Sequence, residues 1–203
     1  MKKLILAGSA LVLLFISCKK DSSGTSGGST ALSGTWKFTS LASQTQATDE
    51  YNIGGDDFKD VTTSNYTSEN NAGTITFSGN TAATSAVAYD VNTTLFLSSY
   101  EDNVLVDTLS SPLSISIPSS SGTSNYKVIG TDSVFFSNGF VTSADLTNGM
   151  PQAATPIGYK FHINGNVLTM TSAIVKDTVE DLGGGTLAQV HEAASLSVTL
   201  TKQ

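Results

Sequence analysis

Residues 159–171 read Tyr159-Lys-Phe-His-Ile-Asn-Gly-Asn-Val-Leu-Thr-Met-Thr171. Apolar side chains alternate with polar ones up to Asn164, which is the pattern of a strand with one buried face. Asn-Gly is the pair that a two-residue type I′ turn favours, because both of its positions need positive φ. The stretch therefore predicts a β-hairpin with Asn164-Gly165 as its turn, and it places His162 on the solvent side.

The same alternation recurs along the chain. Leu113, Ile115 and Ile117 alternate with serines, and at the C-terminus Leu196, Val198 and Leu200 alternate with Ser and Thr, so each set predicts one buried strand face. Residues 187–194 fit a short helix or a strand, and the β-rich context favours a strand. Further strands are predicted at 35–41, 73–77, 84–91, 94–99, 103–109, 126–131 and 133–137. About ten such segments predict an all-β domain, either a closed barrel of roughly eight strands or a β-sandwich.

The N-terminus has the layout of a secretory signal. Lys2 and Lys3 precede a largely apolar run over residues 4–16, which is shorter than the roughly 20 residues that a membrane-spanning helix needs. Its end, Phe15-Ile-Ser-Cys18, resembles the lipobox of bacterial lipoproteins, in which the cysteine thiol receives a diacylglyceryl group and the chain is cut just before it. The resemblance implies a signal peptide over 1–17, lipid such as palmitate on Cys18, and a place in the cell envelope as an outer-membrane lipoprotein, either periplasmic or surface-exposed. The alternatives are an ordinary signal peptide with a chance cysteine and an uncleaved anchor.

The rest of the chain fits a tethered domain. Residues 18–31 are rich in Ser, Gly and Thr, which is typical of a flexible tether, and residues 32–203 are long enough for one β domain. The chain carries 17 acidic residues against 10 basic ones and contains no arginine. Such a composition argues against nucleic acid as a partner. We expect a monomer whose contact with the membrane runs through the lipid on Cys18.

The opening of the domain carries a second resemblance. Leu32-Ser-Gly-Thr-Trp-Lys-Phe38 is similar to the Gly-x-Trp first strand of lipocalins and of the lipocalin-like lipoproteins of Bacteroidota, and the 159–171 hairpin and the closing strand resemble the last third of those proteins. The resemblance implies a single antiparallel up-and-down barrel in which Gly34 admits the chain to the first strand and Trp36 packs across the closed end against a basic residue. Lys202 is the nearby candidate for that residue. A core tryptophan in a β-sandwich is the alternative.

Motifs for catalysis are missing from the sequence. His191-Glu192 lacks the second histidine of a zinc motif, and no nucleophile elbow or phosphate loop is present. Asp56, Asp57 and Asp60 lack the calcium-loop spacing and predict a solvated acidic loop. Glu101-Asp-Asn103 predicts a hairpin tip, and the glycines 183–185 predict a turn. The sequence predicts no enzyme, no metal and no cofactor.

Two functions follow from this reading. The first is a binding module whose barrel holds a small, mainly apolar ligand without covalent chemistry. The second is a structural or interaction lipoprotein with a filled core that contacts another envelope component or a glycan.

Three short motifs suggest a modification. Asp-Thr-Leu at 107–109, Asp-Ser-Val at 132–134 and Asp-Thr-Val at 177–179 resemble the pattern that is O-glycosylated on exported Bacteroidota proteins. This resemblance implies sugar on Thr108, Ser133 and Thr178.

Overall fold

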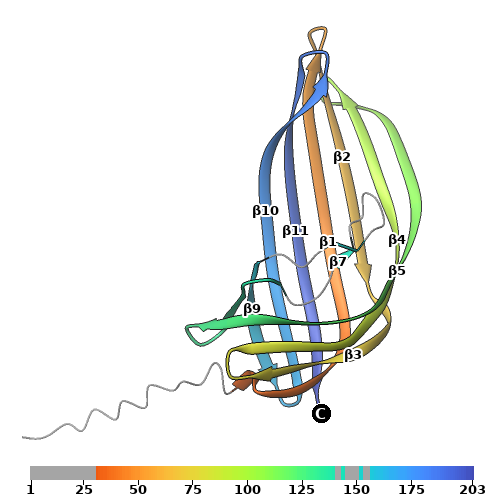
Figure 1. Ribbon diagram of the computed structural model, residues 1–203. Helices are drawn as coiled ribbons and strands as arrows, with labels where there is room; N and C mark the ends of the chain where they lie inside the picture. The colour runs from red at the N-terminus through yellow and green to blue at the C-terminus, as the bar shows by residue number, and fades with distance from the viewer. Residues whose placement is uncertain (1–30, 140–142, 145–150, 153–155) are drawn as a thin grey trace, which may run out of the picture.

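The computed structural model of this chain describes residues 31–139, 143–144, 151–152 and 156–203. These residues form antiparallel strands, so the predicted all-β class is confirmed. The strands are β1 (Gly34–Ile53), β2 (Asp56–Thr67), β3 (Glu69–Ser78), β4 (Thr81–Glu101), β5 (Val104–Ile129), β6 (Ser133–Phe136), β7 (Ser143–Ala144), β8 (Pro151–Gln152), β9 (Ile157–Asn164), β10 (Val167–Gly183) and β11 (Thr186–Lys202). Apart from the small β7–β8 pair, they belong to one large sheet (Figure 1).

This sheet closes on itself as a ring of eight strands. Its order is β11-β10-β9-β6-β5-β4-β2-β1-β3, and β11 also pairs with β1 while β4 also pairs with β3. β2 and β3 occupy one position between β1 and β4, in succession along β1. Where the chain passes from β2 to β3, Ser68 N–H donates to the Leu41 carbonyl at 2.7 Å, and Leu41 N–H donates to Ser68 Oγ at 2.7 Å.

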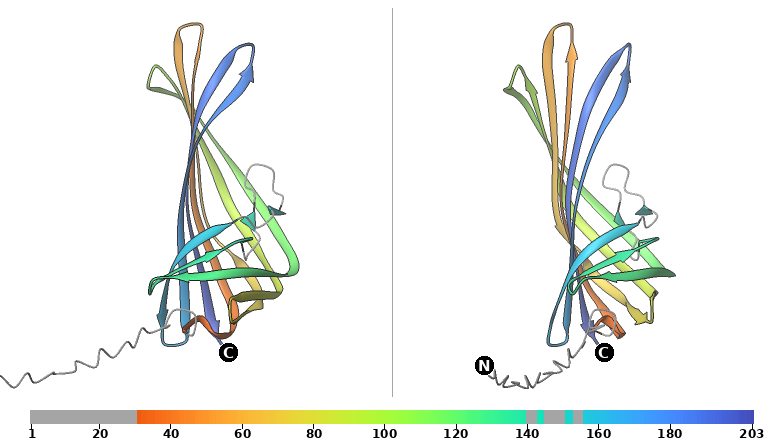
Figure 2. Two further views of the ribbon diagram at one scale, coloured as in Figure 1. Left: turned by 60° about the vertical axis from the view of Figure 1, so that its left-hand side comes forward. Right: turned by 90° about the vertical axis from the view of Figure 1, so that its left-hand side faces the viewer.

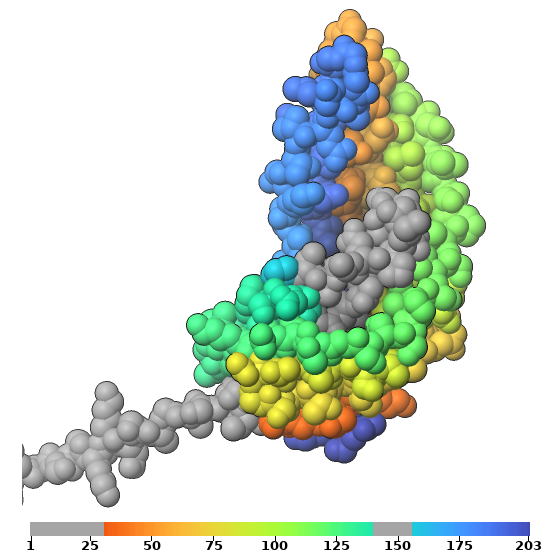
Figure 3. Space-filling view, viewed as in Figure 1, coloured from red at the N-terminus to blue at the C-terminus, as the bar shows by residue number. Residues whose placement is uncertain are grey.

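Three long hairpins extend beyond the ring's core and separate at their tips. We call them the β1–β2, β4–β5 and β10–β11 arms, with turns at Gly54-Gly55, Asp102-Asn103 and Gly184-Gly185. Figure 2 shows the three tips apart from one another, at the end opposite to the C-terminus, and Figure 3 shows the β10–β11 and β4–β5 arms on either side of β1–β2. The sheet is therefore closed at one end and open at the other.

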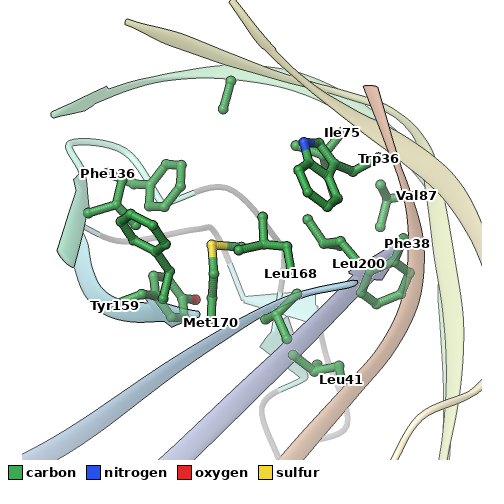
Figure 4. Close-up of a cluster of buried hydrophobic side chains, with 14 of the residues drawn as sticks. Trp36, Phe38, Leu41, Ile75, Val87, Phe136, Tyr159, Leu168, Met170 and Leu200 are labelled. Atoms are coloured by element: carbon green, nitrogen blue, oxygen red, sulfur yellow. The ribbon is translucent and has the colours of Figure 1, made fainter. Parts of the chain in front are cut away.

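The core lies at the closed end, where the C-terminus also lies. Each of the eight ring strands contributes buried side chains, and Figure 4 shows Trp36, Ile75, Phe136, Leu168 and Leu200 among them. The alternation predicted for residues 113–117 and 196–200 is confirmed, since these apolar residues are buried or pack against the core. Burial of apolar surface at this end is what holds the ring closed.

Strand lengths were predicted wrongly. Predicted segments 84–91 and 94–99 are both parts of β4, whereas 113–117 lies within β5 and 103–109 and 126–131 overlap its two ends. Residues that suggested breaks lie inside these strands. Pro112 sits where β5 pairs on one side only, which is where proline is tolerated, and the strand pair absorbs register shifts between Thr84 and Tyr89.

Two local predictions need correction. The 159–171 hairpin is present, but Asn164 pairs with Val167, so the turn is Gly165-Asn166 and not Asn164-Gly165. Only Gly165 has positive φ there (61°), which is the pattern of a type II′ turn rather than type I′. Residues 56–60 are no loop either, because they begin β2 and pair with β1. The predicted turns at 101–103 and 183–185 and the strand at 187–194 are confirmed.

Candidate functional site

The residues of the Gly-x-Trp motif lie together at the closed end. Trp36 is fully buried between β11 and β3, opposite Lys202 on one side and Ile75 on the other. Its Nε1–H donates to the Leu32 carbonyl at 2.7 Å, and Lys202 Nζ lies 5.3 Å from the ring centroid. Gly34 has φ of 118°, and a β-carbon on it would lie 3.5 Å from Lys202 Cε. The expected contact between Trp36 and Lys202 is present.

At the open end, a cavity of about 450 Å³ lies where the β1–β2 arm meets the β4–β5 turn and the start of β11. We call it the tip pocket. It is lined by Glu50, Tyr51, Asn52, Asp57, Phe58, Lys59, Asn103, Leu187 and Gln189. These residues are aromatic, amide-bearing and charged, and sequence reasoning missed them as a group because they come from three separate strands and a turn.

Strand pairing fixes the aromatic part of the tip pocket. Tyr51 on β1 is directly opposite Phe58 on β2, and their rings stack with centroids 5.5 Å apart and planes 14° apart. The Tyr51 hydroxyl donates to Asp60 Oδ2 at 3.1 Å, and Ser99 Oγ donates to Asp60 Oδ1 at 2.5 Å. Burial raises the pKa of Tyr51, and the hydrogen bond to Asp60 raises it further. Tyr51 is therefore a neutral, oriented aromatic side chain.

Hydrogen bonds hold the polar part of the pocket in place. Asn52 Nδ2–H donates to Asp57 Oδ1 at 2.8 Å, and its Oδ1 accepts from Gly55 N–H at 3.2 Å. Asp102 N–H donates to the Asp57 carbonyl at 2.8 Å, which ties the β4–β5 turn to the start of β2. Lys59 lies beside the pocket with its Nζ 4.9 Å from the Tyr100 ring centroid. By strand alternation Asn52, Asp57 and Lys59 lie on the face of the β1–β2 arm opposite to the stacked rings, and residues of both faces line the pocket.

A pair of carboxylates lies next to the Tyr51–Phe58 pair, two residues along β1 and β2 toward the closed end. Asp49 and Asp60 are directly opposite each other on β1 and β2. Burial raises the pKa of Asp49, and the charges of Glu180, Asp60 and Glu192 raise it further. Like charges that face each other across strands destabilise a sheet, so this pair costs folding stability at neutral pH.

Two further grooves lie on the sheet. One, of about 610 Å³, runs past Lys160, Thr171, Ser195 and Gln44, and the other, of about 370 Å³, lies at His191 and Asp177. His191 Nδ1 is 2.6 Å from Asp177 Oδ1, and both side chains are at least half exposed. Thr48 is opposite His191 in the β1–β11 pairing, yet within the described residues no hydrogen bond joins them. A threonine nucleophile needs a hydrogen bond to its base, so Thr48 and His191 do not form such a nucleophile–base pair in this structure.

The three predicted glycosylation positions differ in access. Thr108 is exposed on β5, and its N–H donates to Asp107 Oδ1 at 2.8 Å. Ser133 is half-buried, and its Oγ donates to Asp132 Oδ1 at 3.0 Å. Thr178 Oγ1 is buried and has no hydrogen-bond partner, so an enzyme acting on the folded domain could not reach it. Thr108 is the most accessible of the three.

The remaining predicted residues fall as follows. His162 is exposed, as predicted. Cys18, with the predicted signal peptide and most of the predicted tether, lies outside the described residues. Across residues 31–139, 143–144, 151–152 and 156–203, no group of three or more His, Cys, Asp or Glu residues could hold a metal ion, and no helix has the length and apolarity to cross a membrane.

We compared the chain with known protein families, curated proteins and solved structures. No family model, curated protein or solved structure matches this chain.

Proposed function

We propose that this chain is a lipid-anchored envelope lipoprotein whose lipocalin-like β-barrel domain binds a glycan at its open end and carries out no covalent chemistry. The tip pocket carries this proposal. Its volume of about 450 Å³ falls in the usual range for ligand sites, and its lining combines the stacked Tyr51 and Phe58 with the hydrogen-bonded amide of Asn52. Aromatic rings with neighbouring hydrogen-bonding groups suit a ligand that has both apolar faces and hydroxyls.

Two observations support the barrel and its anchoring. The ring of eight strands and the contact of Lys202 with buried Trp36 agree with a lipocalin-like closed end. Lys2, Lys3, the apolar run and Cys18 agree with a lipoprotein signal. Two acyl chains or more give stable anchoring without any membrane-inserting surface on the protein.

The closed end gives little support to the expectation of an apolar ligand deep in the barrel. Its interior is occupied by the side chains of the core itself, with Trp36, Phe38, Leu168 and Leu200 each fully buried. A ligand is therefore more easily accommodated between the arms than inside the closed end, because both polar and apolar side chains are exposed between the arms.

An oligosaccharide array tests the glycan proposal. We expect the purified domain to be retained by a subset of neutral or acidic oligosaccharides, and Tyr51→Ala to weaken that binding at least tenfold, because one face of the aromatic pair is lost. The matched control is Phe96→Ala, which removes an aromatic side chain that is 54% exposed and outside the pocket. No retention by any oligosaccharide, or equal loss in both variants, would contradict the proposal.

A second candidate is a small apolar ligand held between the arms. Leu109 on β5 and Ile174 on β10 have the same strand parity as core residues Ile115 and Met170, so they face inward, yet they are 60% and 46% exposed. A fluorescent fatty acid titrated into the protein distinguishes this candidate, because its binding should fall in Ile174→Asp and persist in Tyr51→Ala.

A further inference from the structure

The upper part of β10 is a free sheet edge. β9 pairs with β10 only as far as Thr171, and beyond it β11 is the single partner among the described residues. This edge is exposed, with Val175 at 64% and Val179 at 55% exposure, and it also carries charged residues at 176, 177, 180 and 181. A long exposed edge offers unpaired N–H and C=O groups to another strand.

Backbone geometry sets which residues can pair there. The Asn166 carbonyl accepts from Lys202 N–H at 2.7 Å, so even-numbered residues of β10 bond to β11. Odd-numbered residues then direct their N–H and C=O away from β11. The β10–β11 pairing shows no register shift between Val167 and Asp181, so along the free edge these groups belong to Ala173, Val175, Asp177, Val179 and Asp181.

The sequence of this edge is complementary to itself in one register. A second β10 running antiparallel must match odd residues with odd ones, so the pairing is centred on a residue. Centred on Thr178, it sets Lys176 opposite Glu180 and Ile174 opposite Leu182, each pair occurring twice by symmetry. It sets no two like charges opposite each other.

The neighbouring registers are electrostatically unfavourable. Centring the pair on Lys176, Asp177 or Glu180 sets that residue against its own copy. Centring it on Val179 sets Asp177 against Asp181. Like charges directly opposite destabilise paired strands.

An independent observation points to the same residue. Thr178 Oγ1 is the one buried side-chain polar atom without a hydrogen-bond partner in the part of the chain that the structure describes. In the register centred on Thr178 the two copies of this residue form a non-hydrogen-bonded pair, where side chains approach closely, and a rotation about χ1 turns the hydroxyl, which is buried within its own chain, toward that of the second copy. Threonine pairs in that position form hydrogen bonds across strands.

We propose that this chain forms a two-fold symmetric dimer through antiparallel pairing of its β10 edges, centred on Thr178. The dimer replaces the monomer expected from the sequence, and it does not depend on the proposed glycan site. The exposed stretch of β5 is a poorer edge for self-pairing, because between Val104 and Pro112 its one charged residue is Asp107 and it has no cation to match it.

Disulfide crosslinking tests the register directly. In the full chain carrying Cys18→Ser, which leaves no other thiol, we expect Thr178→Cys to form a disulfide-linked dimer under a mild oxidant, because opposite Cα atoms in such a pair are about 4.5 Å apart. The matched control is Val179→Cys, whose two copies are two residues out of register and beyond disulfide reach. Equal crosslinking of both variants, or of neither, would overturn the proposal.

A charge swap tests the dimer without new thiols. The chain carrying Cys18→Ser should have twice the monomer mass by light scattering, Lys176→Glu should return it to monomer mass, and Lys176→Glu with Glu180→Lys should restore the dimer. Lys127→Glu, at an exposed lysine of β5, should leave the mass unchanged, and circular dichroism confirms that each variant is folded. A parent chain with the monomer mass, or a Lys176→Glu variant with an unchanged dimer mass, would overturn the proposal and indicate that another segment or partner covers this edge.

Discussion

Trp36 packs at the closed end with its whole side chain out of water. Three features fix it there: the Nε1–H bond to Leu32, the neighbouring side chains of β3 and β11, and the Lys202 ammonium over the ring. Lys202 itself is exposed, so its contribution through the ring is expected to be about 0.5–1 kcal/mol. Most of the stabilisation by this residue therefore comes from buried apolar surface.

Truncation of Trp36 should be severe. We expect Trp36→Ala to lower the free energy of unfolding by about 3–5 kcal/mol through lost burial and the remaining cavity, out of roughly 5–15 kcal/mol for an ordinary domain. Lys202→Ala is the matched control and should cost under about 1 kcal/mol. The denaturant midpoint measures both. Similar midpoints for Trp36→Ala and the parent chain would be inconsistent with a core built around this residue.

Asp49 predicts a pH dependence of opposite sign to that of most carboxylates. Its pKa is raised in the folded chain, so the group favours folding below its ordinary pKa of 3.8, and this stability is lost as pH rises through the raised value. Asp49→Asn should therefore be more stable than the parent chain at pH 7, by roughly 0.2–1 kcal/mol for a like-charge cross-strand pair, and nearly equal to it at pH 3.

Asp90 provides the control for this effect. Hydrogen bonds from Ser116 and Asn70 lower its pKa, so its stabilisation is lost as pH falls through the lowered value. Asp90→Asn should reduce stability at pH 7 and make less difference in acid. Urea melts at the two pH values decide between the signs, and an Asp49→Asn variant that is less stable at pH 7 would show that the facing carboxylates are not a cost.

At the scale of single residues, the sequence predicts local features better than pairs. Trp36 with Lys202 could be anticipated because a family resemblance links them. The pairs Asp49–Asp60 and Tyr51–Phe58 could not be anticipated, because each arises from the register of β1 against β2. The sequence of β2 has no clear apolar alternation from which this strand could be predicted.

The arms and the closed end of each strand differ in their surroundings. Along β10, Leu168 and Met170 are fully buried, whereas Ile174, Lys176 and most residues beyond them are exposed. Few buried contacts and an exposed hydrogen-bonded backbone are the features of locally low stability. The strands are continuous, but the free energy of opening them should fall toward the tips.

Hydrogen exchange can measure this gradient within one strand. The even-numbered amides of β10 all face β11, so those of Leu168 and Met170 should exchange at least tenfold more slowly than those of Lys176 and Glu180 on the scale of minutes to hours. The comparison within β10 controls for strand pairing, since burial is what changes. Uniform protection from Leu168 to Glu180 would show that the arms are as stable as the ring.

At the scale of elements, strand class followed from alternation and strand length did not. Alternation marked the halves of β4, β5 and β11 that face the core. Several arm portions have mostly polar or exposed side chains on both faces, as in residues 43–53 and 172–183, so periodicity carries no signal there. The pairing partner, and not the strand's own sequence, extends these elements.

For the whole molecule, two regions of different character follow from these elements. Apolar packing closes the ring near Trp36 and the C-terminus, and the arms at the other end carry the tip pocket and the free β10 edge. The proposed function uses this division, because a domain tethered at its N-terminus by lipid can present its open end to ligands in the surrounding medium.

The anchoring claim joins the sequence to this arrangement, and the intact mass of the protein recovered from the membrane fraction of its own cells tests it most directly. We predict the mass of residues 18–203 carrying a diacylglyceryl group and a further acyl chain, together with loss of the membrane-bound form in Cys18→Ser. A chain that retains residues 1–17, or an unmodified cysteine on a chain that stays with the membrane at high salt, would contradict the account.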